Sequence, residues 1–187
     1  MINIFMKKFI PLIILIILII AIAFATYRIN EQTLTDLDLQ DDAIHFSNVQ
    51  IKLAEFELPD LFDEKKKFSN ADLQGQYHLV SFFASWCSTC RAQHDILMRI
   101  KNENIIDIYG IAWRDIKENT KSYLEKSGNP YKKVASDSKA QFSKIAELNA
   151  VPETWIVDKN GVVVMRYRGN LQEFALDEIK NFLEKNK

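Results

Sequence analysis

The sequence predicts an α/β domain with a mixed β-sheet, preceded by one membrane-spanning helix. Two observations predict the sheet. Short apolar runs alternate with helix-compatible segments after residue 77, and Asn160-Gly161 joins the last two runs. Asn-Gly between two apolar runs is the strongest short signal for a β-hairpin. The third observation, an uncharged stretch over residues 9–27, predicts the membrane helix.

The N-terminal segment has the pattern of a signal anchor. Lys7 and Lys8 precede the uncharged stretch, whose 19 residues would extend about 28 Å as a helix, close to the bilayer core. The positive-inside rule then leaves residues 1–8 in the cytoplasm and exports the rest. A cleavable signal peptide shares the basic start, and small residues over 21–25 could serve its cleavage, but the apolar run is longer than a usual signal core.

The exported part begins with a polar, acidic linker over residues 28–47, which connects the anchor to a domain over 48–187. An N-terminal strand extension is expected at 56–62, followed by a turn at 72–76. The run 78–83 is too continuously apolar for a half-exposed strand, and a helix over 88–102 follows it with an apolar stripe.

The second half of the domain contains a central insert and a closing hairpin. A buried strand is expected at 105–112, and then a helix at 116–126 that ends at Gly128 and Pro130. The remaining elements follow in chain order: an extended piece at 133–135, a helix at 138–148, strands at 154–157 and 161–167, and an amphipathic helix at 171–185. Two crossover units are thus expected to contribute parallel strands to a mixed sheet, which the antiparallel hairpin and the last helix complete.

Charge and cysteine content narrow the function. The net charge is −1 and no Lys/Arg-rich stripe occurs, which argues against a nucleic-acid partner. The lysine run 65–67 sits beside Asp63 and Glu64, so we interpret it as a solvated loop. Two cysteines cannot form a disulfide scaffold, so the domain depends on its own core.

Cys87 and Cys90 are the only cysteines, and they are separated by two residues where a strand passes into a helix. This spacing puts both sulfurs on one helix face, and a helix N-terminus stabilises the thiolate of Cys87. Zinc is the alternative for such a pair, but structural zinc takes four ligands and the three histidines are scattered. No metal is therefore expected, and no NAD or flavin fingerprint points to a cofactor.

The segment over 79–90 resembles the active-site strand and turn of the thioredoxin superfamily, and Val151-Pro152 has that family's placement ahead of the hairpin. The resemblance implies a thioredoxin-like fold. It also implies a cis peptide bond before Pro152, facing the cysteines and offering backbone groups to an extended substrate. Trp86 would give a flat apolar contact beside the sulfurs, although an aromatic filling the first turn explains it equally well.

A narrower resemblance is to the membrane-anchored thiol:disulfide interchange proteins of cytochrome c maturation, the DsbE or CcmG type. It rests on residues 109–111, 128–131 and 151–158, the last reading Val-Pro-Glu-Thr-Trp-Ile-Val-Asp. Glu153 beside the proline is a distinguishing feature of that family, although a hairpin carboxylate is often only solvated. The chain departs from the family pattern at Ser88 (usually proline), at Ser81 (a buried carboxylate in thioredoxins) and at Gln93 (often Glu).

The resemblance implies a reductant held in the bacterial inner membrane, with its domain in the periplasm. Its expected partners are apocytochrome c or a dithiol protein of cytochrome maturation, and a membrane dithiol protein that supplies electrons. The expected site contains Cys87 and Cys90 as the redox-active disulfide, with Trp86 and residues 151–153 (Val-Pro-Glu) binding the substrate. The alternatives are a reductase for another exported client such as a copper-site protein, a disulfide-forming oxidant, and a non-enzymatic binding or metal-chaperone module.

Overall fold

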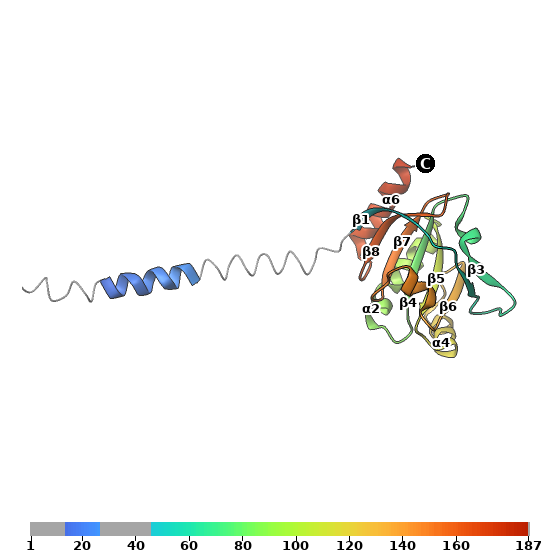
Figure 1. Cartoon of the computed structure of the whole chain (residues 1–187), viewed down its shortest axis with the longest axis horizontal. Coiled ribbons are helices and arrows are strands. Elements are labelled where there is room, and N and C mark those ends of the chain that lie inside the picture. Colours follow the sequence, from blue (N-terminus) through green and yellow to red (C-terminus); the bar gives the residue numbers. More distant parts are fainter. Residues whose placement is uncertain (1–13, 27–45, 187) are drawn as a thin grey trace, which may run out of the picture. The chain divides into compact units, whose positions relative to one another are not determined.

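The computed structural model describes residues 14–26 and 46–186, which form two separate units. The first unit contains a helix over 14–26, drawn in blue in Figure 1. Among the described residues, no helix is both long and apolar enough to span a bilayer. The remainder of the anchor predicted over 9–27, the cytoplasmic segment 1–8 and the linker up to residue 45 lie outside the described residues.

The second unit is an α/β domain around a six-stranded mixed sheet (Figure 1). The strands are β1 (Phe46–Lys52), β2 (Glu57–Pro59), β3 (Lys67–Ser69), β4 (His78–Phe83), β5 (Asp107–Trp113), β6 (Lys133–Asp137), β7 (Glu153–Val157) and β8 (Val162–Arg168). The helices are the 3₁₀ helix η1 (Asn70–Leu73), α2 (Ser88–Ala92), α3 (His94–Asn102), α4 (Lys117–Ser127), α5 (Gln141–Ile145) and α6 (Glu173–Lys185). The predicted thioredoxin-like topology is confirmed, because the sheet order is β1-β8-β7-β4-β5-β6 with β4, β5 and β6 parallel.

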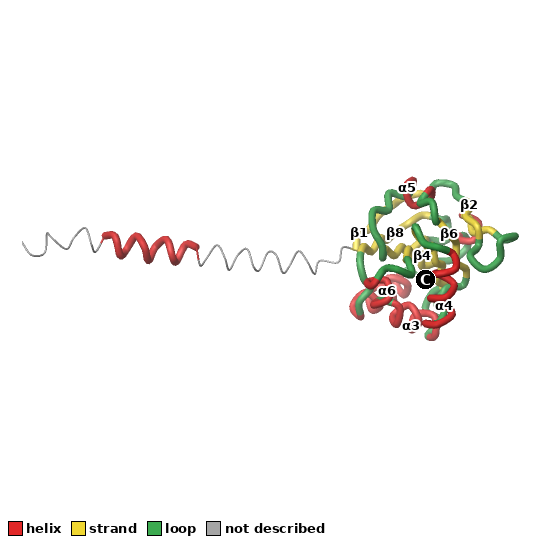
Figure 2. The backbone as a smooth tube through the Cα atoms, turned by 90° about the horizontal axis from the view of Figure 1, so that it is seen from below, coloured by secondary structure: helices red, strands yellow, loops and turns green. Residues whose placement is uncertain are grey.

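The sheet separates two apolar layers. On one face, α3, α4 and α6 pack against Leu79, Phe83 and Ile156. On the other, α5 and the segments around β2, β3 and η1 pack against Phe82 and Trp155. Figure 2 shows α3, α4 and α6 together on one side of the strands and α5 on the opposite side. All six residues of β4 are buried, as expected for a central strand covered on both faces.

Two predicted helices differ from those observed. The helix predicted over 88–102 is interrupted at Gln93, which separates α2 from α3. The Gln93 side chain is fully buried, and its Oε1 accepts the Leu171 backbone N–H at 3.1 Å. Leu171 lies just before α6, so sequence periodicity cannot reveal this contact. The helix predicted over 138–148 shrinks to α5, because Ala140 adopts a left-handed conformation and the Asp137 carboxylate accepts the first N–H groups of the helix.

Both edges of the sheet differ from the prediction. β1 starts inside the predicted linker and pairs antiparallel with β8, so the domain begins at least two residues earlier than expected. The strand predicted over 56–62 contributes only β2, which pairs with β3 outside the main sheet. An isolated bridge from Asp60 to Ala135 connects this hairpin to edge strand β6. The hairpin therefore protects an edge that would otherwise be open.

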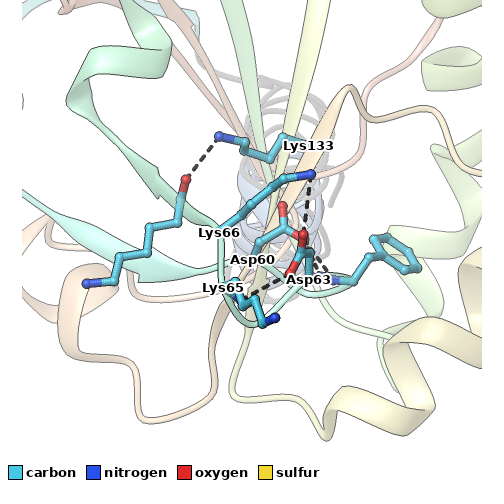
Figure 3. A network of polar contacts seen from close by, with 7 residues as sticks. Asp60, Asp63, Lys65, Lys66 and Lys133 are labelled. Carbon is cyan, nitrogen blue, oxygen red and sulfur yellow. Dashed lines mark hydrogen bonds and ion pairs between the residues drawn. The ribbon is translucent and has the colours of Figure 1, made fainter.

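The turn between β2 and β3 is organised by its own aspartates (Figure 3). Asp60 accepts the Asp63 backbone N–H at 2.9 Å, and Asp63 accepts that of Lys65 at 3.1 Å and pairs with Lys66. Lys133 reaches over from β6 and donates to the backbone of β3. Because Lys65 and Lys66 are exposed, the interpretation of the lysine run as a solvated loop is confirmed there.

Gly110 in β5 lies very close to the ring of Tyr131, which precedes β6. A Cβ on Gly110 would lie 2.9 Å from the Tyr131 ring and 3.0 Å from that of Phe83. These two rings stack with their centroids 4.8 Å apart, and they belong to the same apolar layer as the cysteines. A glycine is thus required at position 110 for the stacked rings of Phe83 and Tyr131 to pack against β5.

His78, the first residue of β4, should make stability depend on pH. It is 2% exposed and packs edge-on against Tyr109, and burial lowers its pKa below the ordinary 6.5. As the pH falls below 6.5, the unfolded chain binds a proton at this histidine while the folded chain does not. The free energy of unfolding therefore decreases with falling pH until the lower pKa of the folded state is reached. We expect His78→Phe to flatten the loss of stability between pH 7 and pH 5, measured by urea unfolding. An unchanged pH dependence in the variant would rule this assignment out.

Candidate active site

The site begins where β4 ends. Its last residues lead into a tight turn in which the Cys87 N–H donates to the Ala84 carbonyl at 3.2 Å. Cys87 is the N-cap residue of α2, and its sulfur accepts the Cys90 backbone N–H at 3.1 Å. The Thr89 hydroxyl lies 3.4 Å from the same sulfur. Donors therefore converge on Cys87, which favours a thiolate there once the disulfide is opened.

Cys87 and Cys90 form a disulfide, with Cα atoms 5.3 Å apart. Both residues are almost fully buried and belong to the apolar layer beneath α3. The predicted redox-active pair is thus present in its oxidised form. Among the described residues, no group of three or more His, Cys, Asp or Glu side chains could hold a metal ion.

The opposite wall of the site is the segment before β7. The Val151–Pro152 peptide is cis, as the resemblance implied, and the Val151 carbonyl oxygen lies 3.7 Å from the Cys87 sulfur. Because β4 and β7 are antiparallel neighbours, the end of one strand and the start of the other meet at the same edge of the sheet. The structure thus brings together Cys87, Cys90, Val151 and Pro152.

Trp86 lies on the surface immediately before the disulfide. Its side chain is 56% exposed, and its indole Nε1 donates to the Arg114 carbonyl at 3.2 Å. The Trp113 ring lies 6.1 Å away, centroid to centroid. Trp86 is therefore oriented by the end of β5 with much of its ring exposed, and it does not fill the first helical turn.

Asp115 holds the turn that carries Trp86, a role that the sequence did not reveal. Residues 113–115 could be suspected as groove walls only because they end a strand of an open α/β sheet. The buried Asp115 carboxylate accepts both the N–H and the hydroxyl of Ser85, at 2.6 and 3.0 Å, and also the Thr120 hydroxyl at 2.9 Å. It thereby ties the turn before Trp86 to the start of α4.

Glu153 is neither solvated nor beside the sulfurs. It is 3% exposed, and its Oε1 accepts the indole N–H of Trp155 at 2.6 Å and the Nε–H of Arg166 at 2.7 Å. Glu153 pairs with Phe82 across the strands, on the sheet face opposite the cysteines. The alternative of a solvated hairpin carboxylate is therefore excluded, since the side chain is half of a buried ion pair, and Glu153 does not line the substrate-binding wall in which the sequence placed it.

In the described part of the chain, no other carboxylate replaces the buried acid that thioredoxins carry at the position of Ser81. Ser81 is fully buried in the middle of β4, and Thr154 faces it from β7. The buried carboxylates among the described residues are Asp60, Asp115, Asp137 and Glu153. Each bonds to groups other than the cysteines. Glu153 has no contact through which it could assist the deprotonation of Cys90.

Arg91 and His94, three residues apart, do not pair on the helix surface. Arg91 is exposed, and its Nη1 donates to the Ser85 carbonyl at 2.6 Å. His94 is 5% exposed, with Nδ1 2.8 Å from the Tyr123 hydroxyl and Nε2 3.1 Å from the Ser127 carbonyl. One histidine side chain thus bonds to both the Tyr123 side chain and the backbone at the C-terminal end of α4.

Comparisons with known proteins agree with this geometry. The profile of the Redoxin family matches residues 48–183. The thiol:disulfide interchange protein DsbE of Haemophilus influenzae is 31% identical over 168 residues, which cover 90% of each chain. The DsbE protein of Xylella fastidiosa is 31% identical over 122 residues, but the match covers only 65% of this chain and 62% of that one. A thioredoxin-like solution structure from Neisseria meningitidis superimposes with a TM-score of 0.63 at 24% identity, covering 72% of this chain and 91% of the other, which shows the shared fold alone.

Proposed function

The chain belongs to the Redoxin family and, within it, to the DsbE-type thiol:disulfide interchange proteins, and from this premise we propose that it is a thiol–disulfide oxidoreductase that reduces the cysteines of exported client proteins. The observation that carries the proposal is the disulfide at the N-cap of α2, with the cis-proline segment 3.7 Å from its first sulfur. A cysteine pair that alternates between disulfide and dithiol takes up and releases two electrons without a cofactor.

The proposed reaction starts from the dithiol form. The Cys87 thiolate attacks one sulfur of a client disulfide, the client S–S bond breaks, and the leaving sulfur takes up a proton. The Cys90 thiolate then attacks the Cys87 sulfur of this mixed disulfide and releases the second client thiol, which is also protonated. The client gains two electrons and two protons, and the protein is left with the disulfide seen in the structure. An external dithiol donor must then reduce it again.

The substrate-binding roles of Trp86, Val151 and Pro152 are part of the proposal, whereas Glu153, which the sequence placed with them, supports this wall without touching the client. Trp86 offers an exposed apolar ring beside the sulfurs, and the half-buried Val151 offers backbone groups to an extended client. Glu153 acts from behind this wall, because its pairing with Arg166 fixes the start of β7 just after Pro152.

We further propose that the client is apocytochrome c or a dithiol partner in cytochrome c maturation. Haem attachment needs free thiols, whereas an exported compartment tends to oxidise them. The DsbE-type family supports this client, and the anchor pattern over residues 9–27 supports a place in the bacterial inner membrane with the domain in the periplasm.

Trapping of mixed disulfides tests the client. Cys90→Ala removes the resolving thiol, so a client attacked by Cys87 stays bound, and we expect haem-attachment proteins or their dithiol partners among the adducts. The matched control is the Cys87→Ala/Cys90→Ala double variant, which can trap nothing. If haem-attachment proteins and their partners are missing from the adducts, the cytochrome assignment fails while the oxidoreductase assignment stands.

A further inference from the structure

Two arginines beside the disulfide have no acidic partner. The structure describes five arginines, of which Arg99, Arg166 and Arg168 each lie within ion-pair distance of a glutamate. Arg91 and Arg114 are the two without such a partner among the described residues, and both are exposed. Both also contact the turn that carries Trp86, one through the Ser85 carbonyl and the other through its own carbonyl.

The carboxylates near these arginines, in the sequence or in the fold, either bond to other groups or form no ion pair with them. Asp115 is buried and accepts hydrogen bonds from Ser85, Ile116 and Thr120. Asp137, which pairs with Trp113 across the strands, accepts the first N–H groups of α5. Asp95 lies one turn beyond Arg91, and Glu118 lies one turn beyond Arg114, but neither carboxylate forms an ion pair with its arginine in the part of the chain that the structure describes. The two guanidinium groups therefore remain available to a partner.

Trp86 and Trp113 supply an ordered apolar floor between the two charges. The Trp86 indole is held by its bond to the Arg114 carbonyl, and the Arg114 guanidinium carbon lies 4.9 Å from the centre of the Trp113 ring. The backbone of Arg114 is left-handed, with φ of 46°, and its N–H donates to the Asp137 carbonyl at 3.2 Å. Both the ring and the cation are therefore positioned before any client arrives, which reduces the entropy lost on binding.

We propose that Arg91 and Arg114, with Trp86 and Trp113 between them, form a binding surface for an acidic segment of the client next to its reacting cysteine. Guanidinium groups recognise carboxylates with a planar pair of donors, and unpaired charges at an interface select partners of opposite sign. The inference rests on the proposed function, and it specifies that the client segment bound beside Trp86 is negatively charged.

Peptide binding to the oxidised full chain in a neutral detergent tests this surface without any chemistry. The probes are three fluorescent peptides of one length, with serine in place of cysteine and with Glu, Gln or Lys at the flanking positions. We expect the Glu peptide to bind most tightly and the Lys peptide least. Arg91→Gln and Arg114→Gln should each weaken Glu-peptide binding roughly two- to fivefold, as removal of one exposed charge pair does. Raising the salt concentration should weaken it as well.

Matched variants separate charge from structure. Lys159→Gln removes one positive charge from the hairpin at the far end of β7 and should leave all three affinities unchanged. Arg114→Lys keeps the charge and should restore most of the binding that Arg114→Gln loses. Circular dichroism and thermal unfolding of each variant check that the fold is intact. Equal affinities for the three peptides, no detectable binding of the Glu peptide, or a preference that survives in the Arg91→Gln/Arg114→Gln double variant would each overturn the inference.

A parallel exchange reaction keeps the two proposals apart. Reduced wild-type protein is mixed with a small neutral disulfide, and formation of the Cys87–Cys90 disulfide is followed by mass spectrometry. Failure of this reaction would count against the proposed function alone, whereas the peptide affinities decide the charge of the client segment.

Discussion

Cys87→Ser is expected to reduce disulfide exchange to the uncatalysed background, while Cys90→Ser retains the first step and loses turnover. The Cys87 sulfur accepts the Cys90 N–H and lies next to the Val151 carbonyl, so it is the sulfur closest to the proposed substrate-binding wall. A serine hydroxyl at this position stays protonated near neutral pH and is no substitute for a thiolate.

Turnover is measured as the reduction of a peptide disulfide by the full chain with dithiothreitol as electron source, and adducts are measured by mass spectrometry with protein that has been reduced and then freed of dithiothreitol. Cys87→Ser should give no covalent adduct, whereas Cys90→Ser should accumulate one mixed disulfide per protein molecule and then stop. Ser88→Ala, which changes an exposed residue between the cysteines but keeps both thiols, serves as the matched control and should still turn over. The roles are reversed if the Cys87→Ser protein forms the adduct and the Cys90→Ser protein does not.

Glu153→Ala is expected to lower the free energy of unfolding of the oxidised protein by about 3–5 kcal/mol, the usual consequence of leaving one charge of a buried ion pair unpaired. Arg166 is 5% exposed, and its Nη2 lies 2.6 Å from the Glu153 carboxylate. Without Glu153, the guanidinium of Arg166 and the indole N–H of Trp155 both lose their acceptor. Urea unfolding followed by fluorescence gives the change.

A double-mutant cycle distinguishes the ion pair from simple loss of packing. Glu153→Gln with Arg166→Met removes both charges at similar volume, so the double variant should be more stable than Glu153→Gln alone. Glu173→Gln, which breaks the exposed pair with Arg99, is the control and should cost little. If Glu153→Ala is no more destabilising than Glu173→Gln, the buried pair does not support the start of β7.

Local patterns predicted the centre of the domain well. The apolar run ending at Phe83, the Asn160-Gly161 hairpin and the cis peptide at Pro152 all occur as expected. In each case the signal lies within a few adjacent residues: continuous burial of a central strand, a two-residue turn, or a motif shared with a family. The cysteine pair belongs to the same class, because its spacing alone places both sulfurs on one helix face.

The features that the sequence did not reveal depend on contacts between distant segments. The break at Gln93 depends on a bond to Leu171, 78 residues further along the chain. The role of Asp115 depends on Ser85, 30 residues away, and the burial of Glu153 on Arg166 across the hairpin. No periodicity reports such pairings, so the sequence did not reveal that these polar side chains are buried or which partners they have.

The central claim is that Cys87 and Cys90 work as a reductant, and the equilibrium potential of the pair tests it most directly. The full chain is equilibrated with glutathione buffers of known ratio, and the fraction of disulfide is measured by mass after thiol alkylation. A reductant of exported clients requires a potential near −200 mV or lower, because a stronger oxidant could not pass electrons to them. A value near −120 mV, that of a strongly oxidising thiol–disulfide protein, would contradict the account.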